Sequence, residues 1–253
     1  MIPRVLLLAA LMTACAPAIA SMTISGTRVI FPGSEKEVLV RTNNKGTTPA
    51  LVQVWVDDGD TNPNLDNVKT PFVVTPPVYR VEPGKGQSVR MIYNGMALPQ
   101  DRESLFFFNM LEIPPKAKDA DQGQKLELAF RTRIKIFYRP TGIEESSSEN
   151  ERDKLKWEVV SDAQRGIGFK VTNPTAYYFS FDSVIVMSDG RKITLNSDMV
   201  PPIGSKVLYP AQKLTGAVSS LEFKLINDYG AVIAEKLVWS AAAGRFIATA
   251  KDS

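Results

Sequence analysis

The chain has 253 residues, of which 44% are hydrophobic and 23% are charged, and 30 basic and 27 acidic side chains leave a formal net charge of +3. This charge is too small to indicate nucleic acid or an anionic membrane surface as a partner. There is no histidine and Cys15 is the only cysteine, which excludes Ser-His-Asp and Cys-His catalytic sites and histidine-ligated metals. A chain of this length buries enough surface to fold without disulfides or metals.

Residues 1–20 have the features of a secretory signal peptide. Arg4 provides a positive charge, residues 5–12 form a short apolar stretch, and residues 18–20 (Ala-Ile-Ala) form a small-x-small cleavage site. The apolar stretch is too short to span a membrane, and no later stretch is long enough. We therefore predict cleavage after Ala20 and export of the mature chain.

The leader also contains an alternative processing site. Residues 12–15 (Met-Thr-Ala-Cys) resemble a bacterial lipoprotein signal, which would leave Cys15 acylated at the new N-terminus. Met12 stands where such signals usually have leucine, so cleavage after Ala20 is the favoured prediction. Both alternatives predict export.

Short runs of β-branched and aromatic residues, separated by turn residues, follow the leader. They cover residues 37–41, 51–56, 72–74, 88–93 and 105–113. Turn-prone groups such as residues 43–46 (NNKG) and 75–77 (TPP) lie between them. No window of about fifteen residues has the 3.6-residue periodicity of a capped amphipathic helix. The pattern predicts an all-β chain.

A single change of composition divides the chain. Residues 144–153 (EESSSENERD) contain no apolar residue, which is typical of a solvated linker. Strand patterns resume at residues 155–160, 177–187, 222–226 and 231–239. A spacing of about 8–12 residues between turns favours immunoglobulin-like β-sandwiches. We predict an N-terminal domain at 21–142, a hinge at 143–154, a C-terminal domain at 155–240 and a tail at 241–253 with no assigned role.

Residues 126–138 alternate over an unusual length. One parity is apolar or neutral and the other is mostly charged: Leu126, Leu128, Phe130, Thr132, Ile134, Ile136 and Tyr138 against Glu127, Ala129, Arg131, Arg133, Lys135, Phe137 and Arg139. The ordinary explanation is a strand with one face in the core. The alternative is an apolar edge strand behind the charged segment 116–125. Such an edge is an aggregation hazard unless it docks a strand of another protein.

Motifs along nearly all of the mature chain resemble the periplasmic pilus chaperones of the PapD/FimC family. They are residues 27–32 (TRVIFP), 75–77 (TPP), 98–106 (LPQDRESLF), 108–115 (FNMLEIPP), 133–140 (RIKIFYRP), 173–178 (NPTAYY) and 226–230 (INDYG). The resemblance implies two immunoglobulin-like domains in a boomerang arrangement. It also implies that the protein caps pilus subunits by donor-strand complementation in the periplasm and delivers them to an outer-membrane usher.

The resemblance implies three sets of site residues. Arg28 and Lys135 match the two basic residues that bind the C-terminal carboxylate of a subunit. The strand that enters the open groove of the subunit carries Leu126, Leu128 and Phe130. An ionic network between the domains, which sets the hinge angle, consists of Glu103, Arg139 and Asp228. No cofactor or metal is implied, and the free chaperone could cover its apolar strand by dimerising.

The position of Lys135 in the alternation conflicts with a regular strand that would point the anchor and the subunit-binding residues to the same face. In a regular strand Lys135 points to the opposite face from Leu128 and Phe130. Either a bulge intervenes, or the lower part of the strand faces the interdomain cleft while the upper part faces the subunit. The second alternative is favoured, because the edge and the cleft are different environments along one long strand.

The sequence leaves two other functions to consider. A structural or adhesive surface protein, such as a pilus component or a sugar-binding sandwich, would use aromatic residues such as Trp55, Tyr79 and Tyr93, but core packing explains them more simply. A pilus subunit is usually a single incomplete domain with a disulfide, and the mature chain has no cysteine. An enzyme or Ca²⁺ site would use the acidic turn 57–60 (DDGD), where carboxylates are expected in any case. We therefore predict a chaperone rather than an enzyme.

Overall fold

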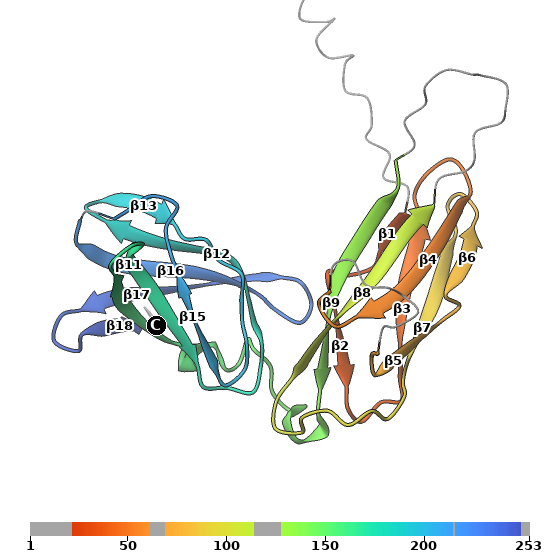
Figure 1. The fold of residues 1–253 in the computed structure, drawn as a ribbon, viewed down its shortest axis with the longest axis horizontal. Coiled ribbons are helices and arrows are strands. Elements are labelled where there is room, and N and C mark those ends of the chain that lie inside the picture. The colour runs from red at the N-terminus through yellow and green to blue at the C-terminus, as the bar shows by residue number, and fades with distance from the viewer. Residues whose placement is uncertain (1–21, 61–68, 114–127, 215, 249–253) are drawn as a thin grey trace, which may run out of the picture.

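A computed structural model describes residues 22–60, 69–113, 128–214 and 216–248 as two β-sandwich domains whose strands run at a steep angle to each other (Figure 1). The described residues contain strands and two short 3-10 helices but no α-helix, and none of them forms a helix long and apolar enough to cross a membrane. The predicted all-β fold with two sandwich domains is confirmed. The leader, Cys15 and Leu126 lie outside the described residues.

The N-terminal domain consists of two sheets. One has the order β1 (Met22–Ile24), β3 (Glu37–Asn44), β7 (Gly86–Tyr93), β5 (Phe72–Thr75). The other has the order β2 (Arg28–Pro32), β9 (Phe130–Arg139), β8 (Ser104–Ile113), β4 (Ala50–Asp57), β6 (Val78–Val81). About every second residue of these strands faces inward, and these side chains fill the space between the sheets. Four of them are completely buried: Phe31, Val52, Phe108 and Ile136.

The chain changes sheets between β1 and β2, and this leaves one strand edge open. Gly26 has a φ of +103°, a conformation that favours glycine. β2 then begins at Arg28 and pairs with β9 in parallel, with Arg28 opposite Lys135 and Pro32 opposite Arg139. Residues 130–134 of β9 therefore have no strand partner on the β2 side among the described residues.

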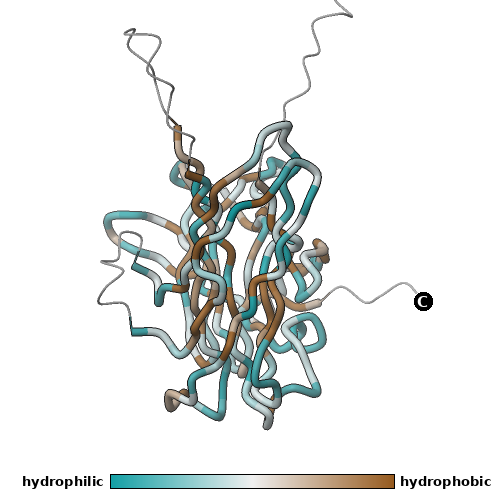
Figure 2. Tube along the Cα trace, turned by 90° about the vertical axis from the view of Figure 1, so that its right-hand side faces the viewer, coloured by the Kyte–Doolittle hydropathy of each residue, from teal (hydrophilic) through white to brown (hydrophobic). Residues whose placement is uncertain are grey.

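The C-terminal domain also has two sheets. The smaller has the order β10 (Lys156–Asp162), β11 (Gly166–Asn173), β15 (Gly204–Leu208). The larger has the order β13 (Arg191–Thr194), β12 (Phe179–Ser188), β16 (Val218–Ile226), β17 (Val232–Ser240), β18 (Arg245–Ala248), and β14 (Met199–Val200) pairs with β12. Trp157 stacks on Phe223 in the core, with ring centroids 5.5 Å apart. Figure 2 shows hydrophobic segments gathered along the middle of the molecule, while several of the loops at its outside are hydrophilic.

Strand pairing in the C-terminal domain continues beyond residue 240, the end predicted from the sequence. The tail forms β18, which pairs with β17, and only 6% of Phe246 is exposed. The ring of Phe246 packs edge-on against Trp239 at 5.2 Å. Its four residues include a charged and a small residue and form no run of β-branched or aromatic side chains, so the sequence pattern does not reveal it.

The predicted solvated linker is packed against both domains. Its 3-10 helices cover Thr141–Ile143 and Arg152–Lys154, and Ser148 between them is buried. The N–H of Ser34 in the N-terminal domain donates to Glu144 at 2.7 Å, and Asn227 in the C-terminal domain donates to Glu149 at 3.0 Å. The charged composition of this segment therefore provides contacts to the domains rather than free hydration.

Candidate functional site

One face of β9 changes its environment along the strand. Ile134 and Ile136 belong to the N-terminal core, whereas Phe130, on the same face, is 64% exposed and Leu128 is 58% exposed. β9 pairs with β8 without a register shift from Phe130 to Tyr138, so no bulge intervenes there. The upper part of β9 thus presents exposed apolar side chains beside an open edge, and Lys135 points to the opposite face.

Arg28 and Lys135 meet where that open edge ends. The two residues are partners in the parallel ladder of β2 and β9. Arg28 donates to the carbonyl of Ile226 in the C-terminal domain at 2.8 Å, and its guanidinium lies 5.8 Å from the centroid of the Phe137 ring. Lys135 reaches Ser180 of the C-terminal domain, with Nζ 3.4 Å from Oγ. Both cations therefore lie between the domains.

The electrostatics of this pair favour an anion. Burial lowers the pKa of Lys135, with Asp198 opposing the shift and the charge of Arg28 adding to it. Burial also lowers the pKa of Arg28, against the influence of Asp228 and Glu103. Neither cation forms an ion pair with a carboxylate of the described residues, and Nε of Arg28 is buried without a hydrogen-bond partner among them. An incoming carboxylate would compensate two partly desolvated cations at once.

A buried ionic network lies at the junction of the domains. Arg139 forms ion pairs with Glu103 and Asp228, each at 2.8 Å, and the side chains of Arg139 and Glu103 are 7% and 2% exposed. Glu103 also accepts from the N–H of Tyr178 at 2.7 Å. Burial alone would lower the pKa of Arg139, but hydrogen bonds and ion pairs with Asp228 and Glu103 raise it above its ordinary value. The structure thus brings together the three residues named from the sequence, across two domains.

A close contact between Gly230 and Thr27 also joins the domains. Gly230 has a φ of +83°, and a Cβ there would lie 2.7 Å from Oγ1 of Thr27. We expect Gly230→Ala to lower the free energy of unfolding by about 1–2 kcal/mol, because it adds backbone strain and a steric clash. Urea denaturation would measure it. Gly84→Ala is the matched control, since Gly84 has a φ of +71° with no atom nearby. An equal loss of unfolding free energy in both variants would show that the contact with Thr27 adjusts without destabilising the protein.

Asp57, the last residue of β4, has a structural role that the sequence alone does not indicate. Asp57 is completely buried, accepts from Nδ2 of Asn109 at 2.7 Å, and forms ion pairs with Arg131 and Arg133. Asp57 therefore forms ion pairs with two of the three cations that alternate along β9, whereas Lys135 has no carboxylate partner in the described part of the chain. The alternation of cations was visible in the sequence, but their distant partner was not.

The aromatic residues named for a sugar-binding alternative are held by neighbouring side chains of the N-terminal domain. Tyr79 is buried and hydrogen-bonded to Thr42 at 2.9 Å, and Tyr93 stacks on Tyr138 at 5.0 Å beside the core. Arg131 lies over the ring of Trp55, 5.0 Å from its centroid. Among the described residues, no three Asp, Glu, His or Cys side chains are grouped to hold a metal ion. These aromatic side chains pack within the N-terminal domain.

Comparison with known proteins identifies the family. The model of the pili and flagellar-assembly chaperone PapD N-terminal domain matches residues 21–144, and that of the pili assembly chaperone PapD C-terminal domain matches residues 150–237. The probable fimbrial chaperone YadV of Escherichia coli K12 is 42% identical over 220 residues, covering 85% of this chain and 88% of that protein.

Two solved structures share the fold. The Pseudomonas aeruginosa CupB2 chaperone has a TM-score of 0.73 and 37% identity, covering 86% of this chain and all of that chain. The complex of Salmonella enterica SafA pilin with the SafB chaperone gives a TM-score of 0.71 and 26% identity, covering 88% of this chain and 99% of the matched one. Because the two family models together match most of the sequence, the chain belongs to the PapD family of pilus assembly chaperones.

Proposed function

We propose that this protein binds pilus subunits in the periplasm by lending them a strand, and passes them to an outer-membrane usher without catalysing a reaction. One observation carries the proposal: Phe130 at the start of β9 and Leu128 just before it are exposed, and the open edge of β9 ends at Arg28 and Lys135, two cations without a carboxylate partner among the described residues. An exposed apolar strand edge is costly to a free protein and suits strand addition.

The direction of β2 supports a specific mode of strand addition. β2 already pairs in parallel with the lower part of β9 and begins at Arg28. A subunit strand that continued this line along residues 130–134 would run in the same direction and end beside Arg28 and Lys135. Its C-terminal carboxylate would then reach both cations, while Phe130 and Leu128 would enter the open groove of the subunit. Leu126 would continue the same parity.

Two further observations support the cellular setting. The relative YadV is a probable fimbrial chaperone, and the SafB chaperone was solved in complex with a pilin. The leader at residues 1–20 predicts export to the periplasm, with lipid attachment at Cys15 as the minor alternative. In the absence of a subunit the same edge of β9 is accessible to a second copy of the chain, so we expect the free protein to form a capping dimer.

A pull-down from the periplasm of a pilus-expressing culture tests the proposal. Tagged wild type should co-purify a small β-protein identified by mass spectrometry, and Arg28→Ala and Lys135→Ala should each lose it. Arg41→Ala is the matched control, because Arg41 is an exposed cation on β3. Recovery of the same protein by all variants would refute the carboxylate anchor. Recovery of no small protein by the wild type would refute subunit binding.

The anchor is also expected to reduce the stability of the free protein. The lowered pKa of Lys135 means that its burial cost is fully present at neutral pH, below that pKa. Lys135→Met should therefore unfold at the wild-type temperature or up to about 3 °C higher, measured by calorimetry. The exposed Lys192→Met on β13 should leave Tm unchanged. A fall of several degrees in Lys135→Met alone would show that Lys135 stabilises the free fold.

A further inference from the structure

The upper part of β9 is paired with a neighbouring strand on one side only. Residues 130–134 pair with β8 and have no strand partner on the β2 side among the described residues. Residues 135–138 of the same strand pair with both β8 and β2. A segment with few paired backbone groups opens more easily than one that is paired on both sides. Side-chain contacts are therefore important for keeping residues 130–134 extended.

Two guanidinium groups tie this part of β9 to a single buried carboxylate. Arg131 and Arg133 lie on the face opposite Phe130, and each forms an ion pair with Asp57, at 3.4 Å for Arg131. The side chains of the two arginines are 27% and 23% exposed, whereas that of Asp57 is completely buried. Asp57 belongs to β4, and β8 lies between β4 and β9 in the sheet. The ion pairs thus reach across β8 and connect β9 with β4.

Side chains of β8 complete this set of contacts. Oδ1 of Asn109 accepts from Nε and Nη2 of Arg131 at 3.0 and 2.7 Å, while its Nδ2 donates to Asp57 at 2.7 Å. The guanidinium of Arg133 lies over the ring of Phe107, 3.7 Å from its centroid. A planar guanidinium that is paired and stacked in this way has a defined orientation as well as a neutralised charge.

The alternation of the strand transmits this restraint to the apolar face of β9. Successive residues of a strand point to opposite faces, so contacts that fix Arg131 and Arg133 also fix the direction of Phe130. A slip of β9 by one residue along β8 would turn both arginines away from Asp57 and move Phe130 to the other face. The ion pairs therefore favour the register in which Phe130 shares a face with the core residues of the strand.

We propose that Asp57 is a positioning residue for strand addition. Through the two arginines it keeps residues 130–134 extended and in register before a subunit arrives, and this inference rests on the proposed function. An edge that is already ordered spares the subunit the conformational entropy that ordering would cost on binding. Without the carboxylate the edge opens for part of the time, and the subunit binds only the fraction of molecules in which it is ordered.

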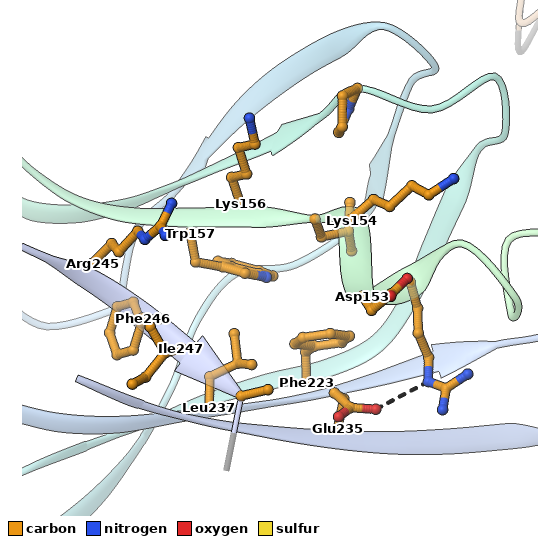
Figure 3. Close-up of a pocket in the computed structure, with 14 residues that line it drawn as sticks. Asp153, Lys154, Lys156, Trp157, Phe223, Glu235, Leu237, Arg245, Phe246 and Ile247 are labelled. Atoms are coloured by element: carbon orange, nitrogen blue, oxygen red, sulfur yellow. Dashed lines mark hydrogen bonds and ion pairs between the residues drawn. The ribbon is translucent and has the colours of Figure 1, made fainter. Parts of the chain in front are cut away.

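Hydrogen exchange of the free protein measures the positioning directly. Asp57→Asn keeps the size of the side chain and removes its charge. The N–H groups of residues 130–134 that bond to β8 should exchange at least about tenfold faster than in wild type, whereas those of residues 135–138 should keep their rates. Glu235→Gln is the matched control, because Glu235 is ion-paired with Arg152 at 3.0 Å in the C-terminal domain (Figure 3). It should leave the exchange rates of both segments unchanged.

Subunit capture separates positioning from a general loss of stability. Asp57→Asn should bind the subunit about tenfold more weakly than wild type, because part of the protein has a disordered edge. Val81→Ala shortens a buried side chain of β6, which lies three strands away from β9 in the same sheet, and lowers the overall stability. This variant should capture the subunit like wild type. A loss of capture in Val81→Ala as large as that in Asp57→Asn would overturn the inference.

A second variant keeps Asp57 in place. In Arg133→Gln the carboxylate retains Arg131, so exchange of residues 130–134 should rise by a smaller factor, about threefold. Unchanged exchange of these residues in both Asp57→Asn and Arg133→Gln would overturn the inference, and so would equal capture by Asp57→Asn and a wild type that binds the subunit. A wild type that captures no subunit would contradict the proposed function instead, and the exchange rates of the free protein would still decide whether Asp57 orders the edge.

Discussion

Phe130→Glu should reduce subunit capture by at least about a hundredfold, because docking would bury an unpaired carboxylate in an apolar groove at a cost of about 3 kcal/mol or more. Phe130 is 64% exposed in the free protein, so the variant should keep the wild-type Tm within about 2 °C. Quantitative co-purification with the subunit, beside a thermal scan of the free variant, measures both effects.

The control for Phe130→Glu introduces the same negative charge at another exposed apolar residue. Val73 on β5 is 53% exposed and lies in the other sheet of the N-terminal domain, away from β9. Val73→Glu should capture the subunit like wild type. If both variants lose the subunit, the effect is one of general surface charge. If neither loses it, Phe130 does not enter the subunit groove.

Arg139→Met should lower the free energy of unfolding by about 3–5 kcal/mol, because it leaves Glu103 buried without its cation. Urea denaturation measures the loss. In the same variant Asp228 no longer pairs across the junction, and small-angle scattering should show a broader distribution of interdomain angles. We expect the angle to respond because the network connects Glu103 and Arg139 of one domain with Asp228 of the other.

An exposed ion pair provides the comparison for Arg139→Met. Arg80 and Glu82 pair at 2.9 Å with more than half of each side chain exposed, so Arg80→Met should cost less than about 1 kcal/mol. The double variant Glu103→Leu/Arg139→Met should recover part of the lost unfolding free energy, because it removes the buried carboxylate that has no cation partner. A loss below 1 kcal/mol in Arg139→Met would show that water compensates Glu103 at the junction.

Strands that bury only one face were the most predictable elements. β3, β4, β5, β7 and β8 begin and end within three residues of the ranges that runs of β-branched and aromatic residues predict. β11 (Gly166–Asn173) and β15 (Gly204–Leu208) were missed, because glycine and polar residues interrupt their apolar pattern. The pattern does not predict β18, because its four residues include a charged and a small residue and form no run of β-branched or aromatic side chains. Local pattern thus predicts a strand where such a run is uninterrupted.

The site shows the same limit at the level of single residues. Arg131, Arg133 and Lys135 are equivalent in a sequence pattern, since each occupies the same parity of one strand. Only the fold shows that Asp57, far away in the chain, pairs with the first two and not with Lys135. The resemblance to a family selected Lys135, but the physical difference between the three cations comes from tertiary contacts.

The starting point of β2 has a consequence for how clients are distinguished. The turn at Gly26 fixes Arg28 as the first residue of β2, and thereby fixes where a strand docked along residues 130–134 has to stop. In the proposed binding mode the last residue of the client sets the register of the docked strand, and each residue before it lies about 3.3 Å further along β9. One added terminal residue would turn every client side chain to the opposite face. Clients of unrelated sequence would then be accepted by the spacing of their apolar residues from the carboxyl end.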